Sequence, residues 1–276
     1  MLLYGETGRS VPHTMGSVHA PETRGAPLSR DAMEIEPAEH TPRERSTIDT
    51  HINTIIGCPV YLESMQQLYP SCLGSRLEPY DLRELNDYRR TADRPTDAAK
   101  TRMVMIMPHA IASVTIVRVS PRAGVTDTWV QHVSAASPHA SPQLHRASAM
   151  LTSMRLPADC VVHAILYTDV KGVAVLGLFD LSSVGTKQMR SESPLARHTC
   201  MRETVPEQTL ELGGRVLLVR YLWVGCEGAC LQALTDPRMI PNMSFAVRCI
   251  GVLPTHIDNE PFQCKMLPLV LPNASG

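Results

Sequence analysis

Residues 160–181 read CVVHAILYTDVKGVAVLGLFDL, which is two apolar runs joined by a short polar turn. The runs at 160–168 and 173–181 have the length of strands and are rich in branched aliphatic residues. Between them lies Asp169-Val170-Lys171-Gly172, a set of turn-forming residues with glycine at its end. This stretch therefore predicts a β-hairpin.

Further strand candidates lie on both sides of this hairpin. They are residues 103–107, 111–119, 128–133, 215–224, 229–234, 244–253 and 264–271. Residues 144–154 are expected to form a loop or a short helix. Many short strands without regularly intervening helices are typical of an antiparallel sandwich. We therefore expect a mainly β fold, a jelly-roll-like antiparallel β-sandwich, with its core domain at 103–257 and a short C-terminal tail at 258–276.

Two segments precede the strand-rich region. Residues 1–48 carry scattered prolines among small, polar and charged residues and show no period, so we expect a disordered, mildly acidic N-terminal tail. Residues 49–102 are expected to form a helical lead-in segment. Its short helices would begin at Pro59 and at Pro79, because proline is favoured at the first helical position.

Composition and charge exclude several classes of protein. The 276 residues include 26 Lys or Arg and 27 Asp or Glu, so the formal net charge of −1 excludes a highly basic packaging protein. Hydrophobic residues make up 43% and aromatic residues only 4%, which predicts an aliphatic core. No apolar run reaches about 18 residues, so a multi-span membrane protein is excluded. The most apolar region, 103–119, is interpreted as core strands, with a peripheral membrane contact as the alternative.

Cysteine chemistry depends on the compartment. The N-terminus lacks the pattern of a signal peptide, since Glu6 interrupts its apolar residues, and we expect cytosolic residence and reduced thiols. A zinc site drawn from Cys226, Cys230, His198 and Cys200 is one alternative, and buried free cysteines are the favoured interpretation. No phosphate loop, nucleophile elbow or metalloprotease helix is present, so we expect no enzyme, no metal and no cofactor.

Basic side chains are the candidates for binding nucleic acid. They are Arg118, Arg122, Lys187, Arg190, Arg197, Arg202 and Arg215. Together they could line a groove for the backbone of single-stranded RNA. Taken singly, each is more typical of a solvent-exposed charge.

Short motifs follow one another in order through the strand region. They are Met154-Arg155-Leu156-Pro157, Thr168-Asp169 with Gly172, Leu178-Phe179-Asp180-Leu181, Cys200-Met201-Arg202-Glu203-Thr204-Val205, Gly225 with Gly228, Pro241-Asn242, and Val252-Leu253-Pro254. In this order and spacing, residues from about 150 to 256 resemble the 30-kilodalton superfamily of plant-virus cell-to-cell movement proteins. The likeness is to the cucumovirus and bromovirus type.

The resemblance implies a jelly-roll-like β-domain that binds single-stranded RNA, the viral genome, without sequence preference. It also implies self-association, contact with membranes and plasmodesmal host proteins, and action in the cytoplasm and at plasmodesmata, the cell junctions of the plant host. The motif residues with an implied structural role are Pro157, Asp169, Gly172, Leu178, Asp180 and Gly228. We expect Asp180 to end its strand and to fix the following loop by accepting backbone N–H groups. The alternative function is a jelly-roll structural protein, such as a viral capsid or accessory capsid subunit.

Overall fold

The computed structural model describes the strand-rich part of the chain and little before it. The described residues are 54–59, 75–79, 83, 102–120, 127–137, 139–140, 143–230, 245–247, 249–255, 257 and 262–268. All of them belong to one compact unit, His40–Gly276. The tail predicted at 1–48, most of the helical segment predicted at 49–102, and Arg122 lie outside the described residues.

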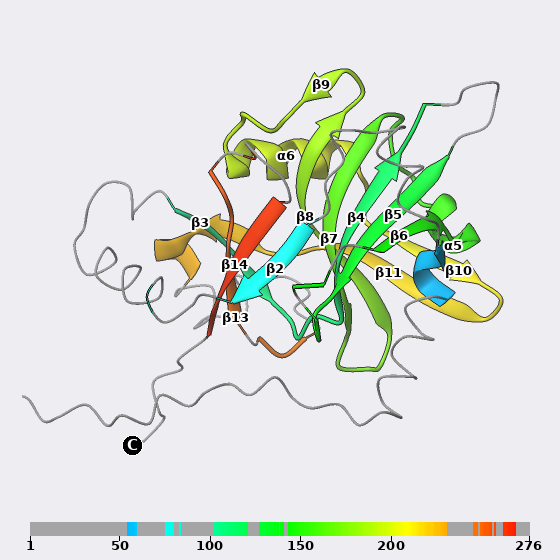
Figure 1. The fold of residues 1–276 in the computed structure, drawn as a ribbon, viewed down its shortest axis with the longest axis horizontal. Helices are drawn as coiled ribbons and strands as arrows, with labels where there is room; N and C mark the ends of the chain where they lie inside the picture. Colours follow the sequence, from blue (N-terminus) through cyan, green and yellow to red (C-terminus); the bar gives the residue numbers. More distant parts are fainter. Residues whose placement is uncertain are drawn as a thin grey trace, which may run out of the picture. The chain divides into compact units, whose positions relative to one another are not determined.

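The described strands form two sheets (Figure 1). The larger sheet has the order β1 (Gly57–Pro59), β6 (Gln143–Ala147), β5 (Thr128–Ser134), β4 (Ala112–Arg118), β7 (Cys160–Thr168), β8 (Ala174–Val184), β11 (Arg215–Tyr221) and β10 (Gln208–Leu212), with β9 (Lys187–Gln188) also paired to β8. The smaller sheet has the order β12 (Val224–Cys226), β3 (Met103–Met107), β13 (Cys249–Val252), β14 (Phe262–Pro268) and β2 (Ser75–Pro79). The described helices include α5 (Ala149–Thr152) and α6 (Pro194–Thr204), and short helical turns occur at 54–56 and 227–230.

Most neighbouring strands run antiparallel. The parallel pairs among the described strands are β8 with β11 and β14 with β2. The predicted mainly β fold is confirmed, and the two parallel pairs are a departure from the antiparallel sandwich that was predicted. A parallel pair needs a long connection, and the chain supplies one between β8 and β11 through β9, α6 and β10.

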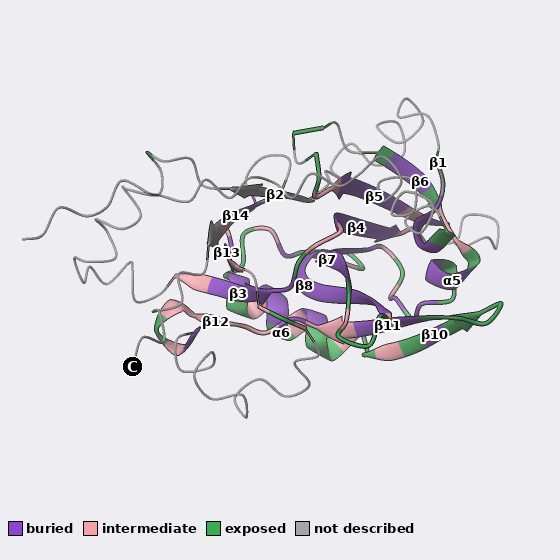
Figure 2. Cartoon of the chain, turned by 90° about the horizontal axis from the view of Figure 1, so that it is seen from below, coloured by how far each residue is buried: buried purple, intermediate pink, exposed green. Residues whose placement is uncertain are grey.

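The predicted hairpin forms the centre of the larger sheet, because β7 and β8 are covered on both faces. On one face Val162 and Leu176 belong to the main core, which α5 and α6 help to close. On the other face Ile165 and Phe179 pack against the smaller sheet. Strands buried on both faces need apolar side chains at consecutive positions, which explains the two continuous apolar runs. Figure 2 shows this central region as buried.

The turn of this hairpin has the predicted geometry. The side chain of Asp169 accepts hydrogen bonds from the backbone N–H groups of Lys171 (2.9 Å) and Val173 (2.8 Å). Gly172 has a φ of +79°, a conformation that glycine adopts without strain. The turn residues therefore have a structural explanation.

Some of the other sequence predictions are confirmed and others are wrong. Strands were predicted close to β3, β4, β5, β11 and β14, and all of these are present. The loop or short helix predicted at 144–154 is wrong at its start, which belongs to β6, and a short helix, α5, follows. The strand predicted at 229–234 is wrong where it is described, because residues 227–230 are helical. Pro59 and Pro79 each end a strand, β1 and β2, and most of the helices predicted after them lies outside the described residues. The interpretation of 103–119 as core strands is confirmed, since most of β3 and β4 is buried.

Helix α6 was not predicted, although its start carries a clear signal. Pro194 occupies the start of the helix, and the Ser193 side chain accepts a hydrogen bond from the backbone N–H of Ala196. The helix packs on β8 and buries Arg197, His198 and Met201. Charged residues in this stretch had indicated an exposed basic segment.

Candidate functional site

A buried ion pair joins β8 to α6. Asp180 and Arg197 are both fully buried. The Arg197 Nε donates to Asp180 Oδ1 at 2.8 Å, and its Nη2 donates to Oδ2 at 2.9 Å. The carboxylate also accepts the backbone N–H of Leu181 at 2.7 Å. Two parallel bonds of this kind are the strongest geometry available to a carboxylate and a guanidinium.

A bulge in β8 directs Asp180 toward this helix. The register between β7 and β8 shifts between His163 and Ala164, so that Asp180 lies opposite His163 and Leu178 opposite Ala164. Phe179 is the extra residue, and the shift re-aims the side chain that follows it. The expectation that Asp180 ends its strand is therefore wrong, because β8 continues to Val184. Its predicted acceptance of a backbone N–H is confirmed at Leu181, but this N–H belongs to β8 itself and not to a following loop.

Every N–H of the Arg197 guanidinium has a partner. Besides Asp180, its Nη1 donates to the carbonyls of Glu192 (2.7 Å) and Thr255 (3.2 Å), and its Nη2 donates to the carbonyl of Pro254 (2.9 Å). A guanidinium has five N–H donors, and all five are used. Arg197 therefore has no donor left for a phosphate, and its assignment to an RNA-binding surface is corrected to a structural role.

Burial and the ion pair act on Asp180 in opposite directions. Burial raises the pKa of the Asp180 carboxyl, while the hydrogen bonds and charge of Arg197 oppose that rise. Because arginine stays protonated in proteins, the bidentate contact is that of an ionised pair. The pair supports the junction of β8, α6 and the loop after β13.

A chain of buried polar side chains lies beside the ion pair. The His163 ring contacts Thr115 Oγ1 through Nδ1 (3.1 Å) and Ser182 Oγ through Nε2 (2.5 Å). Burial, with smaller contributions from Arg197 and Arg190, lowers the pKa of His163 to about 3. His163 is thus a neutral side chain inside the fold, without access to a substrate in solvent.

The other basic candidates are spread over several elements. Lys187 on β9, Arg202 on α6 and Arg215 at the start of β11 are exposed. Arg118 and Arg190 are half-buried, and the Arg118 Nη1 donates to the carbonyl of Met154 at 2.7 Å. The structure therefore leaves Lys187, Arg202 and Arg215 as the more available cations among the described candidates.

Arg202 has an aromatic neighbour that the sequence did not single out. Its guanidinium lies 5.4 Å from the centre of the Tyr221 ring. The Tyr221 hydroxyl donates to the carbonyl of Val205, and Glu207 accepts the backbone N–H of Tyr221 at 2.8 Å. The ring is thus fixed beside a cation, an arrangement suited to stacking with a base. The position of Tyr221 at the end of an apolar strand gave no signal of this contact with Arg202.

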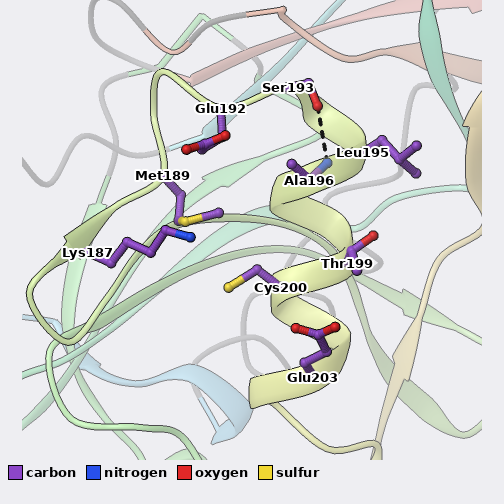
Figure 3. Close-up of a pocket in the computed structure, with 9 residues that line it drawn as sticks. All are labelled: Lys187, Met189, Glu192, Ser193, Leu195, Ala196, Thr199, Cys200 and Glu203. Carbon is purple, nitrogen blue, oxygen red and sulfur yellow. Dashed lines mark hydrogen bonds between the residues drawn. The ribbon is translucent and has the colours of Figure 1, made fainter.

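A hollow of about 450 Å³ lies between β9 and α6 (Figure 3). Its lining residues are Lys187, Met189, Glu192, Ser193, Leu195, Ala196, Thr199, Cys200 and Glu203. The lining includes one lysine and two glutamates, so the charges around the hollow do not favour an anion.

The residues drawn as a zinc site do not converge. His198 and Cys200 are two residues apart on a helix and therefore point in different directions. The His198 Nδ1 contacts the carbonyl of Phe179 at 3.1 Å, whereas Cys200 lines the hollow. Cys230 is buried in the helical turn after β12. Within the described ranges, no group of three or more His, Cys, Asp or Glu residues could hold a metal ion.

The remaining motif residues occupy structural positions. Leu178 is fully buried in the main core, and Pro157 is half-buried ahead of β7. Gly228 lies in the helical turn after β12, with open space where a Cβ would lie. These positions give the three residues structural roles, and no ligand is assigned to them.

The chain matches no protein-family model and no curated protein. In the described part of the chain, no helix is long and apolar enough to cross a membrane. Function must therefore be inferred from the residues themselves.

Proposed function

We propose that the chain is a viral cell-to-cell movement protein. It binds single-stranded RNA without sequence preference and carries the viral genome through the cytoplasm to plasmodesmata of the plant cell. The proposal includes self-association and peripheral contact with membranes and host proteins at these junctions.

The observation that carries this proposal is that two separate motifs contact the same guanidinium group. Arg197, at the start of α6, contacts Asp180 of the Leu178–Leu181 motif and the carbonyl of Pro254 in the last motif. The two motifs are more than 70 residues apart in the sequence. An ordered set of motifs is expected when its members build one structural junction, and this geometry supports the resemblance.

RNA binding is assigned to the exposed cations and the fixed tyrosine. Lys187, Arg202 and Arg215 offer charge to phosphates, and Tyr221 offers a face for a base. Both kinds of contact are independent of base identity. The near-zero net charge of the chain predicts binding of modest strength.

A gel-shift titration of the full chain with unrelated single-stranded RNAs tests this proposal. Equal affinities for the different RNAs, falling steeply between low and moderate salt, are expected. Absence of binding at low salt would remove the nucleic-acid part of the proposal.

One surface feature favours a structural virion protein as the second candidate. The β10–β11 hairpin ends at Gly213-Gly214 and exposes Leu212 (50%) and Val216 (40%) beside this turn. Apolar side chains at the edge of a sheet are suited to contacts between subunits. Closed shells of purified protein under the electron microscope would favour this candidate over the first.

A further inference from the structure

The inward face of the smaller sheet is built from sulfur-containing side chains. Strand β3 reads Met-Val-Met-Ile-Met, with Val104 and Ile106 on the outward face. Six sulfur-containing side chains take part in the cluster between the sheets: Met103, Met105, Met107, Cys249, Cys264 and Met266. The outward face of the same strands carries branched aliphatic residues, including Ile250 and Val252. The two faces of one sheet therefore differ in chemistry, although both pack against apolar neighbours.

Two of the cysteine sulfurs share Met107 as a neighbour near Gly251. Cys249 lies opposite Met107 in the sheet, and the Cys249 Sγ is 3.9 Å from the Met107 Sδ. A Cβ added at Gly251 would lie 2.7 Å from both the Cys264 Sγ and the Met107 Sδ. Because both sulfurs lie so close to one point, they are neighbours across the glycine. The missing side chain of Gly251 is what lets them approach.

Two cysteine sulfurs and one thioether form a set of donors that prefers particular metal ions. Soft sulfur ligands select Cu(I), Zn²⁺ and iron–sulfur clusters, whereas Mg²⁺ and Ca²⁺ require oxygen. A thioether is not among the usual ligands of zinc, so the presence of Met107 favours Cu(I). We propose that Cys249, Cys264 and Met107 form a binding site for a single Cu(I) ion. The site differs from the zinc arrangement considered above, because it uses a thioether and none of its residues belongs to that set.

Binding needs the two cysteines as thiolates, because the thiolate and not the thiol is the form that binds a metal ion. On binding, Cys249 and Cys264 each release a proton to water and form a Cu–S bond, while Met107 binds through its neutral thioether. The Cu(I) ion compensates one of the two thiolate charges, so the loaded site carries one negative charge. Cys249 is half-buried, so it is the member of the site within reach of solvent.

Anaerobic titration of the full chain with Cu(I), in competition with bicinchoninate, tests the site. The wild type is expected to remove one equivalent of Cu(I) from the chelator. Met107→Leu and Cys249→Ala should each weaken binding at least about tenfold, since even indirect changes at metal sites have effects of this size. The matched controls are Met154→Leu, at another fully buried methionine, and Cys200→Ala, at another half-buried cysteine. Both controls should bind as the wild type does.

The proposal is overturned if the wild type takes no Cu(I) from the chelator, or if the site variants bind as tightly as the controls. Should Cys249→Ala fail to fold, Met107→Leu decides the question, because this exchange preserves volume and is well tolerated in cores. X-ray absorption of the copper-loaded wild type should give a first shell of sulfur only, and nitrogen in that shell contradicts the site. None of these measurements involves RNA, so their outcome is independent of the proposed function.

Discussion

The carboxylate of Asp180 accepts parallel hydrogen bonds of 2.8 and 2.9 Å from the guanidinium of Arg197, and both side chains are completely buried. This pair connects the central hairpin to α6. The remaining Arg197 donors reach the carbonyls of Glu192, Pro254 and Thr255, so one side chain joins three segments.

Asp180→Asn is expected to destabilise the protein by about 3–5 kcal/mol, because it leaves Arg197 buried without a counter-charge. Urea unfolding measures the change in free energy. The control is Asp127→Asn, which removes an exposed ion pair to Arg146 at 3.5 Å and should cost at most about 1 kcal/mol. Similar losses in the two variants would contradict a structural role for the buried pair.

A second prediction concerns stability at acid pH. His132 and His145 are buried with their ring centres 4.7 Å apart, and burial together with His145 lowers the pKa of His132 to about 4. A histidine whose folded pKa lies below its unfolded value of about 6.5 binds protons preferentially in the unfolded state. Its contribution is therefore fully present above pH 6.5 and is lost as pH falls toward 4.

Urea unfolding at pH 7.5, 6 and 4.5 should therefore show a smaller acid-induced loss of stability for His132→Phe than for the wild type. The exposed His109 provides the control, and His109→Gln should follow the wild-type pH dependence. An unchanged pH dependence in His132→Phe would contradict the prediction.

A third prediction tests the close packing around Gly251. Gly251→Ala places a methyl group 2.7 Å from two sulfur atoms and should destabilise the protein by about 1–3 kcal/mol through overpacking. Gly228→Ala is the matched control, because nothing lies within 4 Å of its new methyl group. Thermal unfolding should separate the two variants, and equal melting temperatures would mean that the sulfurs are not tightly packed.

A fourth prediction separates stacking from fold at the proposed RNA surface. Tyr221→Leu removes the aromatic face and should weaken RNA binding by about 1–3 kcal/mol. Tyr221→Phe keeps the face and loses only the hydroxyl, which donates to the Val205 carbonyl, so it should bind RNA more tightly than the Leu variant. Equal affinities of the Leu and Phe variants would exclude stacking at Tyr221.

The cation beside this ring gives a related prediction. Arg202→Gln should reduce the salt dependence of RNA binding by the equivalent of about one phosphate contact. Lys171→Gln, in the exposed turn between β7 and β8, is the charge-matched control.

The central hairpin could be predicted because its signal is local. Strands covered on both faces need consecutive apolar residues, and the Asp169–Gly172 turn has a characteristic composition. Shorter strands such as β6 and β10 were missed, since exposed and charged residues interrupt their apolar positions. Their pairing is decided by neighbouring strands.

The role of Arg197 could not be predicted because it depends on long-range contacts. A basic residue on a charged stretch indicates solvent exposure, and the sequence does not reveal that Asp180 and the Pro254 carbonyl lie beside it. The start of α6 was predictable, since Ser193-Pro194 is a recognised helix-start signal. The alternation of methionine in β3 can be seen in the sequence. That this methionine face lies beside Cys249 and Cys264 follows only from the register of the sheet.

Cell-to-cell spread of the fluorescently tagged protein in leaf epidermis tests the proposed movement function. We expect punctate labelling at cell-wall junctions and spread into neighbouring cells for the wild type and for Asp127→Asn, and loss of spread for Asp180→Asn. A wild-type signal that stays diffuse and confined to single expressing cells would contradict the proposed function.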